Sequence, residues 1–513
     1  MRYKARTLHR ESPLTEIRPH MPTCVPRRAW RALALGLLGW ALASCNRGGA
    51  SAAEAPRIAL KPCRLEGLAP QAQCGTYEVF EDRAAKSGRK LSLRVVVVPA
   101  LAAQPQPDPL VLLAGGPGQA ATRMAFILPT VERIRRHRDI LLVDQRGTGD
   151  SNPLDCDPDE GESLSEALDD SQLLPRMKKC REGWDADVRQ YTTPVAMDDL
   201  DEVRAALGYE KLNLWGISYG TRAALVYMRQ HPERVRTAIL DGVAPMSMYL
   251  PLYMPRDGQR ALDLLLVHCE QDAACAKAYP ELRARTEALL SKLETPQRVR
   301  VAHPLTGKPE EVVLSRRAFL GVLRSQLYSA NSASLVPLML DQASRDDWGA
   351  FTAVAVGLLN DTRRGMSPGL LYAVLCAEDA PFFDGAKVEA EAKGTWFGAD
   401  VGLQALSVCQ DWPRAALPAG YREPVVSDVP TLLLSGELDP VTPPSWADDA
   451  RRTLSRSLHV VVPGVGHNTL GADCALALMQ QLVASGAVEG LKPACGANLT
   501  RPPVFTSFAG PVP

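Results

Sequence analysis

The sequence lacks the patterns that mark several large functional classes. It contains no Cys-x-x-Cys pair, no His-Glu-x-x-His run and no cluster of histidines, so it predicts no metal site and no cofactor. It also has no tract of basic residues, and 58 Lys and Arg are balanced by 58 Asp and Glu. Because nucleic-acid binding depends on concentrated positive charge, we expect no nucleic-acid partner.

The apolar run near the start of the chain, at 32–42, is too short to span a bilayer. It follows three arginines and leads into Leu-Ala-Ser-Cys, an order that is typical of an export signal over residues 1–45. The last four residues also resemble the lipobox of bacterial lipoproteins, in which the cysteine becomes the lipidated first residue. We therefore expect a lipid on Cys45, with ordinary cleavage near that position as the alternative.

This signal sets the expected location of the protein. Residues 2–20 carry no fold signal, and Met21 lies at a more usual distance from the apolar run, so Met21 is an alternative start. Residues 46–60 are predicted to be a short tether. We expect an exported protein anchored to a membrane through its lipid, on the periplasmic side or the cell surface, or else a secreted protein.

Ten cysteines follow Cys45, and an even number in an exported chain predicts disulfides. Sequence alone leaves their connectivity open. Pairing neighbours in order gives Cys63 with Cys74, Cys156 with Cys180, Cys269 with Cys275, Cys376 with Cys409, and Cys474 with Cys495.

The chain has 513 residues, of which 46% are hydrophobic, so it can bury a large core. Two strands are predicted at 76–80 and 91–99. Short runs that are apolar throughout then recur at 109–114, 139–143, 212–215, 237–241, 429–435 and 458–462. Such runs are typical of strands buried on both faces, as in parallel sheets covered by helices. The sequence therefore predicts an α/β fold with a doubly wound, mostly parallel sheet.

The series of apolar strands is interrupted between residues 246 and 425. The stretch contains five segments with helical periodicity and few apolar strands. We predict a mainly helical cap at 246–425, inserted between two parts of the sheet domain at 61–245 and 426–500. The Pro-rich end, 501–513, is predicted to be a surface tail.

The segment 213–221 has the pattern of an apolar strand, a Gly-x-Ser-x-Gly turn and the start of a helix. A nucleophile on such a sharp turn has strained backbone angles, so the positions two before and two after it must lack side chains. Gly216 and Gly220 meet this requirement. We predict that Ser218 is a catalytic nucleophile, and a chance match in a Gly-rich chain is the alternative.

A serine nucleophile needs a base to take its proton and an acid to orient that base. His467 follows the last predicted strand, and Asp439 follows the strand before it. Both should therefore lie with Ser218 at the carboxyl edge of the sheet, in the chain order Ser, acid, His that α/β-hydrolases use. We predict Asp439 rather than Glu437 as the acid, and structural roles for the other histidines after the signal.

Backbone N–H groups must meet the oxyanion that forms when a serine attacks a carbonyl. The segment Ala-Gly-Gly-Pro-Gly at 114–118 follows a predicted strand and is suited to exposing such groups. We predict that the oxyanion hole consists of the N–H groups of Gly116 and of Tyr219, the residue after the nucleophile. The alternative is an ordinary tight Gly-Pro turn.

Five motifs occur in order: Gly-Gly-Pro-Gly, Asp-Gln-Arg-Gly-x-Gly-x-Ser, Gly-x-Ser-Tyr-Gly, Gly-x-x-Asp-x-x-Thr-Pro and Gly-x-Gly-His. Together they resemble the α/β-hydrolase serine peptidases related to prolyl iminopeptidase and tripeptidyl aminopeptidase, over 91–495. The chain departs from prolyl iminopeptidase in its longer cap and at Ala114, where that family has His. These departures favour the tripeptidyl aminopeptidase branch, with its characteristic C-terminal segment, over strict proline specificity.

The resemblance implies release of residues or short peptides from free peptide N-termini through an acyl-enzyme. Such an exopeptidase must bind a cationic α-amine, and Glu378 and Asp379 in the cap are the candidates, with a solvated acidic turn as the alternative. A carboxylesterase would use the same triad on small esters. An inactive surface binding protein that kept the fold is the third alternative. The sequence leaves the oligomeric state open.

Overall fold

The computed structural model describes residues 58–66, 71–156, 163–493, 495 and 499–511. The predicted export signal, the alternative start at Met21, the lipidation site Cys45 and most of the tether lie outside these residues. Within the described ranges, no helix is long and apolar enough to cross a membrane.

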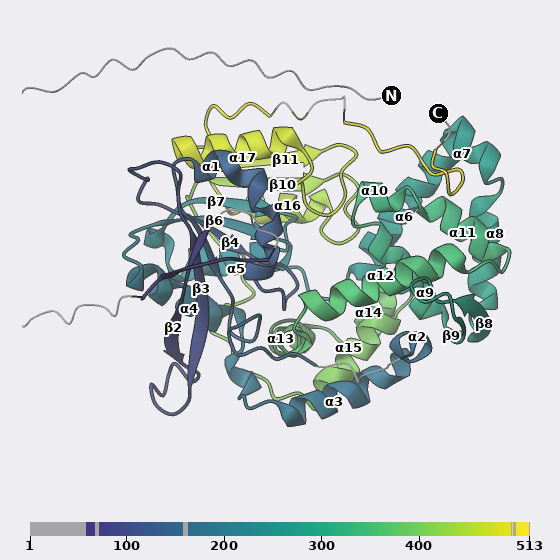
Figure 1. The fold of residues 1–513 in the computed structure, drawn as a ribbon, viewed down its shortest axis with the longest axis horizontal. Coiled ribbons are helices and arrows are strands. Elements are labelled where there is room, and N and C mark those ends of the chain that lie inside the picture. Colours follow the sequence, from purple (N-terminus) through teal and green to yellow (C-terminus); the bar gives the residue numbers. More distant parts are fainter. Residues whose placement is uncertain (1–57, 67–70, 157–162, 494, 496–498, 512–513) are drawn as a thin grey trace, which may run out of the picture. The chain divides into compact units, whose positions relative to one another are not determined.

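The strands of the main sheet follow the order β1-β2-β3-β5-β4-β6-β7-β10-β11 (Figure 1). Pairings among β1, β2, β3 and β5 are antiparallel, and all later pairings are parallel. The predicted mostly parallel sheet is therefore confirmed, with the short β1 as an addition. The strand bounds are β1 Lys61–Cys63, β2 Ala72–Phe80, β3 Lys90–Val98, β4 Leu110–Leu113, β5 Ile140–Val143, β6 Leu212–Ile217, β7 Val235–Asp241, β10 Thr431–Gly436 and β11 Ser457–Val462.

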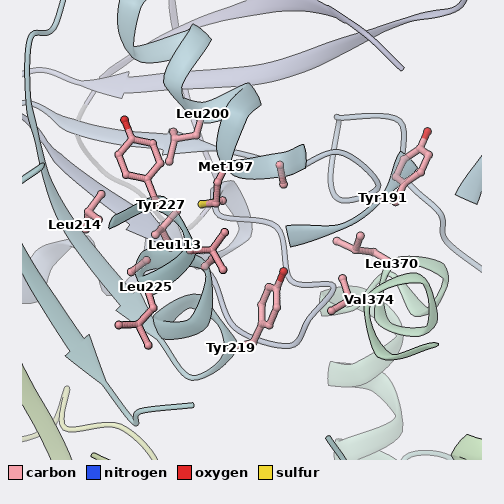
Figure 2. Close-up of a cluster of buried hydrophobic side chains, with 14 of the residues drawn as sticks. Leu113, Tyr191, Met197, Leu200, Leu214, Tyr219, Leu225, Tyr227, Leu370 and Val374 are labelled. Carbon is pink, nitrogen blue, oxygen red and sulfur yellow. The ribbon is translucent and has the colours of Figure 1, made fainter. Parts of the chain in front are cut away.

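Helices cover both faces of this sheet. Within β6, whose residues are all buried, Leu214 belongs to one core cluster and Trp215 to another. Successive side chains of a strand point to opposite faces, so β6 buries both. Figure 2 shows the first cluster, to which Leu214 and Tyr219 belong. The covering helices are α1 Glu132–Arg135, α4 Thr193–Ala206, α5 Tyr219–Gln230, α16 Pro444–Arg451 and α17 Asp473–Ser485.

The segment between β7 and β10 is mainly helical, as predicted, and runs from teal to green in Figure 1. It also contains a hairpin that was not predicted, formed by β8 (Gln297–Ala302) and β9 (Pro309–Leu314). The cap has a hydrophobic core of its own. Its helices are α6 Met254–Gln271, α7 Ala273–Ala278, α8 Leu282–Lys292, α9 Arg316–Gln326, α10 Ala330–Ala333, α11 Val336–Ser344, α12 Gly349–Gly365, α13 Pro368–Val374, α14 Gly385–Ala392 and α15 Asp400–Gln410.

Two segments from outside the predicted cap pack against it. Helix α2 (Leu164–Ala167) contacts β9, and α3 (Leu173–Gly183) contacts α13 and α15. At the other end of the chain, Val504 is buried in the core of the cap. The Phe505 N–H donates to the Ser334 carbonyl at 3.0 Å. The prediction of a surface tail is therefore wrong for this part of it, because its apolar residues find partners on the cap.

All five predicted disulfides are present, with neighbouring cysteines paired in order. Among them, Cys376–Cys409 links the segment that follows α13 to α15. Such a set of bridges fits a protein that folds in an oxidising compartment.

Candidate active site

Ser218 lies on the sharp turn between β6 and α5, with φ 57° and ψ −125°, angles that few residues other than glycine adopt. A Cβ at Gly216 would lie 2.3 Å from the carbonyl oxygen of Gly220, and a Cβ at Gly220 would lie 2.0 Å from that of Leu113. Only glycine therefore fits at either position. The Ser218 N–H donates to the Asp241 carbonyl at 2.9 Å, which fixes the turn against β7.

Asp439 and His467 are in direct contact, with 2.8 Å between Oδ2 and Nδ1, and both are buried. They belong to loops that leave the neighbouring parallel strands β10 and β11 at the same edge of the sheet. The N–H groups of Val441 and Thr442 each donate to Asp439 Oδ1 at 2.8 Å, which fixes the carboxylate. The predicted acid and base are therefore brought together by the fold.

Glu437, the less favoured acid on sequence grounds, forms no hydrogen bond or ion pair with His467 in the described part of the chain. Its Oε2 accepts a hydrogen bond from the Gly464 N–H at 2.9 Å, so it links the two loops that carry Asp439 and His467. Among the histidines predicted to be structural, His459 lies 2.9 Å from Asp448 Oδ1 and 3.0 Å from Ser435 Oγ.

Thr442 is a member of this site that sequence reasoning missed. Its Oγ1 donates to Asp439 Oδ2 at 2.8 Å and lies 3.2 Å from His467 Nδ1. The signal was present in the motif Gly-x-x-Asp-x-x-Thr-Pro, because an Asp often binds polar groups two and three residues further on. Thr442 thus supports the carboxylate from the side that faces His467.

The charges of Asp439 and His467 are coupled. Burial alone would lower the pKa of His467, but the charge and hydrogen bond of Asp439, together with the charge of Asp241, raise it. Burial likewise acts to raise the pKa of Asp439, and the charge and hydrogen bond of His467 outweigh this effect and lower it. The pair therefore favours an ionised Asp439 and a histidine that accepts a proton readily.

Asp241 connects Ser218 to the loop that carries His467. Its backbone carbonyl holds the Ser218 N–H, and its buried carboxylate accepts a hydrogen bond from the Thr469 N–H at 2.9 Å. Burial raises the pKa of this carboxyl to about 7. No hydrogen bond joins Ser218 to His467 in the described part of the chain, and such bonds are often long until substrate binds.

The predicted oxyanion loop lies against Ser218. A Cβ on Gly115 would be 3.2 Å from the Ser218 Cβ, and the next residue, Gly116, has a φ of 109°. Tyr219 is the first residue of α5, where backbone N–H groups lack partners within the helix. The loop of Gly116 and the start of α5 thus meet at Ser218, and their role as oxyanion donors stays a prediction.

Glu378, a predicted amine-binding residue, is completely buried in a turn of π-helix at Leu375–Asp379. Its two oxygens accept hydrogen bonds from the N–H and hydroxyl of Thr193, at 2.6 and 2.9 Å, and from the Tyr421 hydroxyl. The Thr193 hydroxyl in turn lies 2.6 Å from the Tyr219 hydroxyl. Glu378 is thereby connected, through Thr193, to Tyr219, the residue that follows Ser218.

Asp379 is also completely buried, and two guanidinium groups share its charge. Arg222 Nη1 lies 3.0 Å from each of its oxygens, and Arg422 Nη1 lies 3.2 Å from one of them. The alternative of a solvated acidic turn is therefore wrong for both residues. Amine binding by Glu378 and Asp379 stays a prediction, and their burial among protein partners disfavours it.

Comparison with known proteins assigns the family. Residues 108–471 match the family described as alpha/beta hydrolase fold. The chain belongs to this family. The fold, the sheet and the chain order of Ser218, Asp439 and His467 agree with the assignment.

Two relatives of this alpha/beta hydrolase are peptidases. It is 26% identical to the serine protease Hip1 of Mycobacterium tuberculosis, over 91% of this chain and 96% of that protein. It is 29% identical to the tripeptidyl aminopeptidase of Streptomyces coelicolor, over 39% of this chain and 41% of that protein. A crystal structure of proline iminopeptidase from Mycobacterium smegmatis has a TM-score of 0.42 and 18% identity, covering 80% of this chain and 98% of that one. The family match and the two peptidase relatives confirm the predicted resemblance to α/β-hydrolase serine peptidases, and the chain is a serine hydrolase.

Proposed function

We propose that this serine hydrolase is an exported aminopeptidase, which releases residues or short peptides from free peptide N-termini through an acyl-enzyme on Ser218. The observation that carries the proposal is the buried contact between Asp439 and His467 at the sheet edge that also carries the strained Ser218. The two peptidase relatives support peptides as substrates. The five disulfides support export.

The chemistry follows from these contacts. His467 Nε2 takes the proton of the Ser218 hydroxyl while its Nδ1–H donates to Asp439, so that Ser218 Oγ attacks the substrate carbonyl. The N–H groups of Gly116 and Tyr219 stabilise the oxyanion. His467 then gives its proton to the leaving amine. Water hydrolyses the acyl-enzyme by the same route, and Ser218 is regenerated.

A carboxylesterase is the second candidate, because the two acidic residues predicted to bind an amine are buried and paired within the protein. An ester substrate requires no such carboxylate. An inactive binding protein is the least favoured candidate, since it would have no need of the contact between Asp439 and His467.

Hydrolysis of a matched substrate series tests the proposal. The purified protein is given one peptide amide series with free or acetylated N-termini and a short-chain ester, with Ser218→Ala as the control. Cleavage of the free peptides but not of the acetylated ones supports an aminopeptidase. Hydrolysis of the ester with neither peptide cut would replace that assignment by carboxylesterase.

We also propose that the protein is anchored through a lipid on Cys45, for which the lipobox-like Leu-Ala-Ser-Cys is the support. Mass spectrometry of the mature N-terminus tests this directly. A diacylated Cys45, and release of a Cys45→Ala variant from the membrane fraction, are the expected results. An unmodified N-terminus at another residue would contradict the proposal.

A further inference from the structure

One segment of the cap lies directly on the catalytic base. The backbone N–H of His467 donates to the backbone carbonyl of Tyr328 at 2.7 Å. The rings of the two residues also meet edge to face, with their centroids 5.1 Å apart. A Cβ at Gly466 would lie 2.3 Å from the same carbonyl oxygen, so this approach requires glycine there. Tyr328 follows α9 by two residues, and the end of that helix is therefore fixed beside His467.

Arg324 lies four residues before Tyr328, and its guanidinium group contacts the Tyr328 side chain. Its Nη1 donates to the Tyr328 hydroxyl at 3.1 Å, and its guanidinium lies 5.5 Å from the centre of the Tyr328 ring. Its positive charge also opposes the rise in the pKa of His467, which agrees with this proximity. Arg324 thus brings a cation to the edge of the active site.

This cation has no anionic partner among the described residues. The Arg324 side chain lies near Gly258, which follows Asp257 in the chain. The Asp257 carboxylate, however, accepts hydrogen bonds from Trp446 Nε1 at 2.8 Å and from Arg256 Nε at 3.0 Å. The Glu437 carboxylate accepts a hydrogen bond from the Gly464 N–H. Arg324 is only partly buried, and a guanidinium carries five N–H donors of which Tyr328 takes one. Its remaining donors are therefore free to bind a ligand.

The position of Arg324 indicates which part of a substrate it meets. The base that activates Ser218 later protonates the leaving amine, so the leaving group must lie next to His467. If the leaving residue is the last of the peptide, the carbon of its α-carboxylate is two bonds from the leaving nitrogen. The Cβ atom of an Asp or Glu at this position is also two bonds from that nitrogen. A guanidinium binds either carboxylate through paired hydrogen bonds.

We propose that Arg324 binds a carboxylate on the first residue of the leaving group, and that the enzyme therefore prefers substrates with a negative charge at this position. The inference rests on the proposed peptidase function. The carboxylate is either the free C-terminus of a substrate with a single residue after the cleaved bond, or the side chain of Asp or Glu.

Four peptides with free N-termini and one common acyl part separate these sources. Their leaving residues are Ala with a free carboxylate, Ala amide, Asp amide and Asn amide. We expect kcat/KM to be roughly 10- to 100-fold higher for the charged member of at least one pair, since a charged hydrogen bond contributes this much. The pair that differs identifies the carboxylate. Equal values within both pairs would overturn the proposal.

Variants then assign the preference to Arg324. Arg324→Gln should lose most of the ratio between charged and neutral substrates, and Arg324→Lys should keep part of it. Arg300→Gln is the matched control, because Arg300 is exposed on β8 in the cap, and it should keep the full ratio. If Arg324→Gln lowers kcat/KM equally on all four peptides, Arg324 only supports the fold, and the proposal fails.

Esters keep this test separate from that of the peptidase function. If no peptide is cut, the same ratio is measured with 4-carboxyphenyl acetate and phenyl acetate in the wild type and in Arg324→Gln. A ratio that falls in the variant supports carboxylate binding even though the peptidase assignment has failed. A ratio that is the same in both proteins contradicts it.

Discussion

The Thr442 hydroxyl donates a hydrogen bond of 2.8 Å to Asp439 Oδ2, the same oxygen that lies 2.8 Å from His467 Nδ1. Two backbone N–H groups occupy the other oxygen of the carboxylate. Asp439 is therefore held in one orientation by its own loop. The His467 ring is thereby kept in the tautomer that leaves Nε2 free to act as a base.

Replacement of Thr442 by Val should remove this support with little change in volume. We expect kcat to fall roughly 10- to 100-fold, by analogy with the loss of a hydrogen bond that orients a metal-binding side chain, with a smaller change in KM. Steady-state kinetics measures both. Thr352→Val is the matched control, because Thr352 is also buried and its hydroxyl donates to the carbonyl of Trp348, which precedes helix α12 of the cap. A similar fall in kcat in the two variants would contradict the proposed role of Thr442 in orienting Asp439.

The pH dependence of activity follows from the raised pKa of His467. The histidine is a base only when neutral, so kcat/KM should fall as the pH drops through a pKa above the ordinary value of 6.5. In Asp439→Asn the larger of the two charges that raise this pKa is gone, so the pKa of His467 should fall and the acid limb should move to lower pH. The rate itself should fall by about 10⁴-fold. An acid limb at the same pH in both proteins would show that Asp439 does not set this pKa.

The stability of the protein should depend on Asp241. Its pKa of about 7 in the folded protein exceeds the ordinary value of 3.8, so the folded state binds this proton more tightly. The free energy of unfolding should therefore fall as the pH rises from about 4 to about 7, by up to about 1.4 kcal/mol per unit from this group. Asp241→Asn should flatten this slope in denaturant titrations at several pH values. Parallel profiles for variant and wild type would refute the prediction.

Glu378→Gln distinguishes amine binding from a positioning role. Because Glu378 accepts from Thr193, whose hydroxyl meets that of Tyr219, we expect a loss of kcat of similar size on free peptides and on esters. The Gln side chain would place an NH₂ donor where Glu378 has an acceptor oxygen facing other donors. This mismatch should also lower the free energy of unfolding by about 1–3 kcal/mol. Kinetics on both substrates and chemical denaturation measure these effects. A rise in KM confined to free peptides would instead establish amine binding.

The sequence could predict where the members of the proposed triad lie because each of them follows an apolar strand. In a parallel sheet, the carboxyl ends of strands share an edge, so strand order alone brings Ser218, Asp439 and His467 to one place. The same argument explains why Asp439 and Glu437 were hard to separate, since they are only two residues apart on one loop. Their hydrogen bonds, to His467 and to Gly464, decide between them.

Contacts made by the cap could not be predicted in this way. Tyr328 and Arg324 carry no motif, and their place beside His467 depends on how the cap packs against the sheet domain. Glu378 was identified by its charge, but its burial depends on Thr193 and Tyr421, which are distant in sequence. The docking of Val504 on the cap likewise depends on tertiary packing, whereas its Pro-rich surroundings suggested an exposed tail.

Labelling with a fluorophosphonate tests the central claim, that Ser218 is a nucleophile activated by His467, most directly. The account predicts a single covalent adduct on Ser218 in the wild type, found by peptide mapping. It also predicts much slower labelling in His467→Ala and none in Ser218→Ala. Well-folded wild-type protein that is not labelled, or labelling that persists in Ser218→Ala, would contradict it.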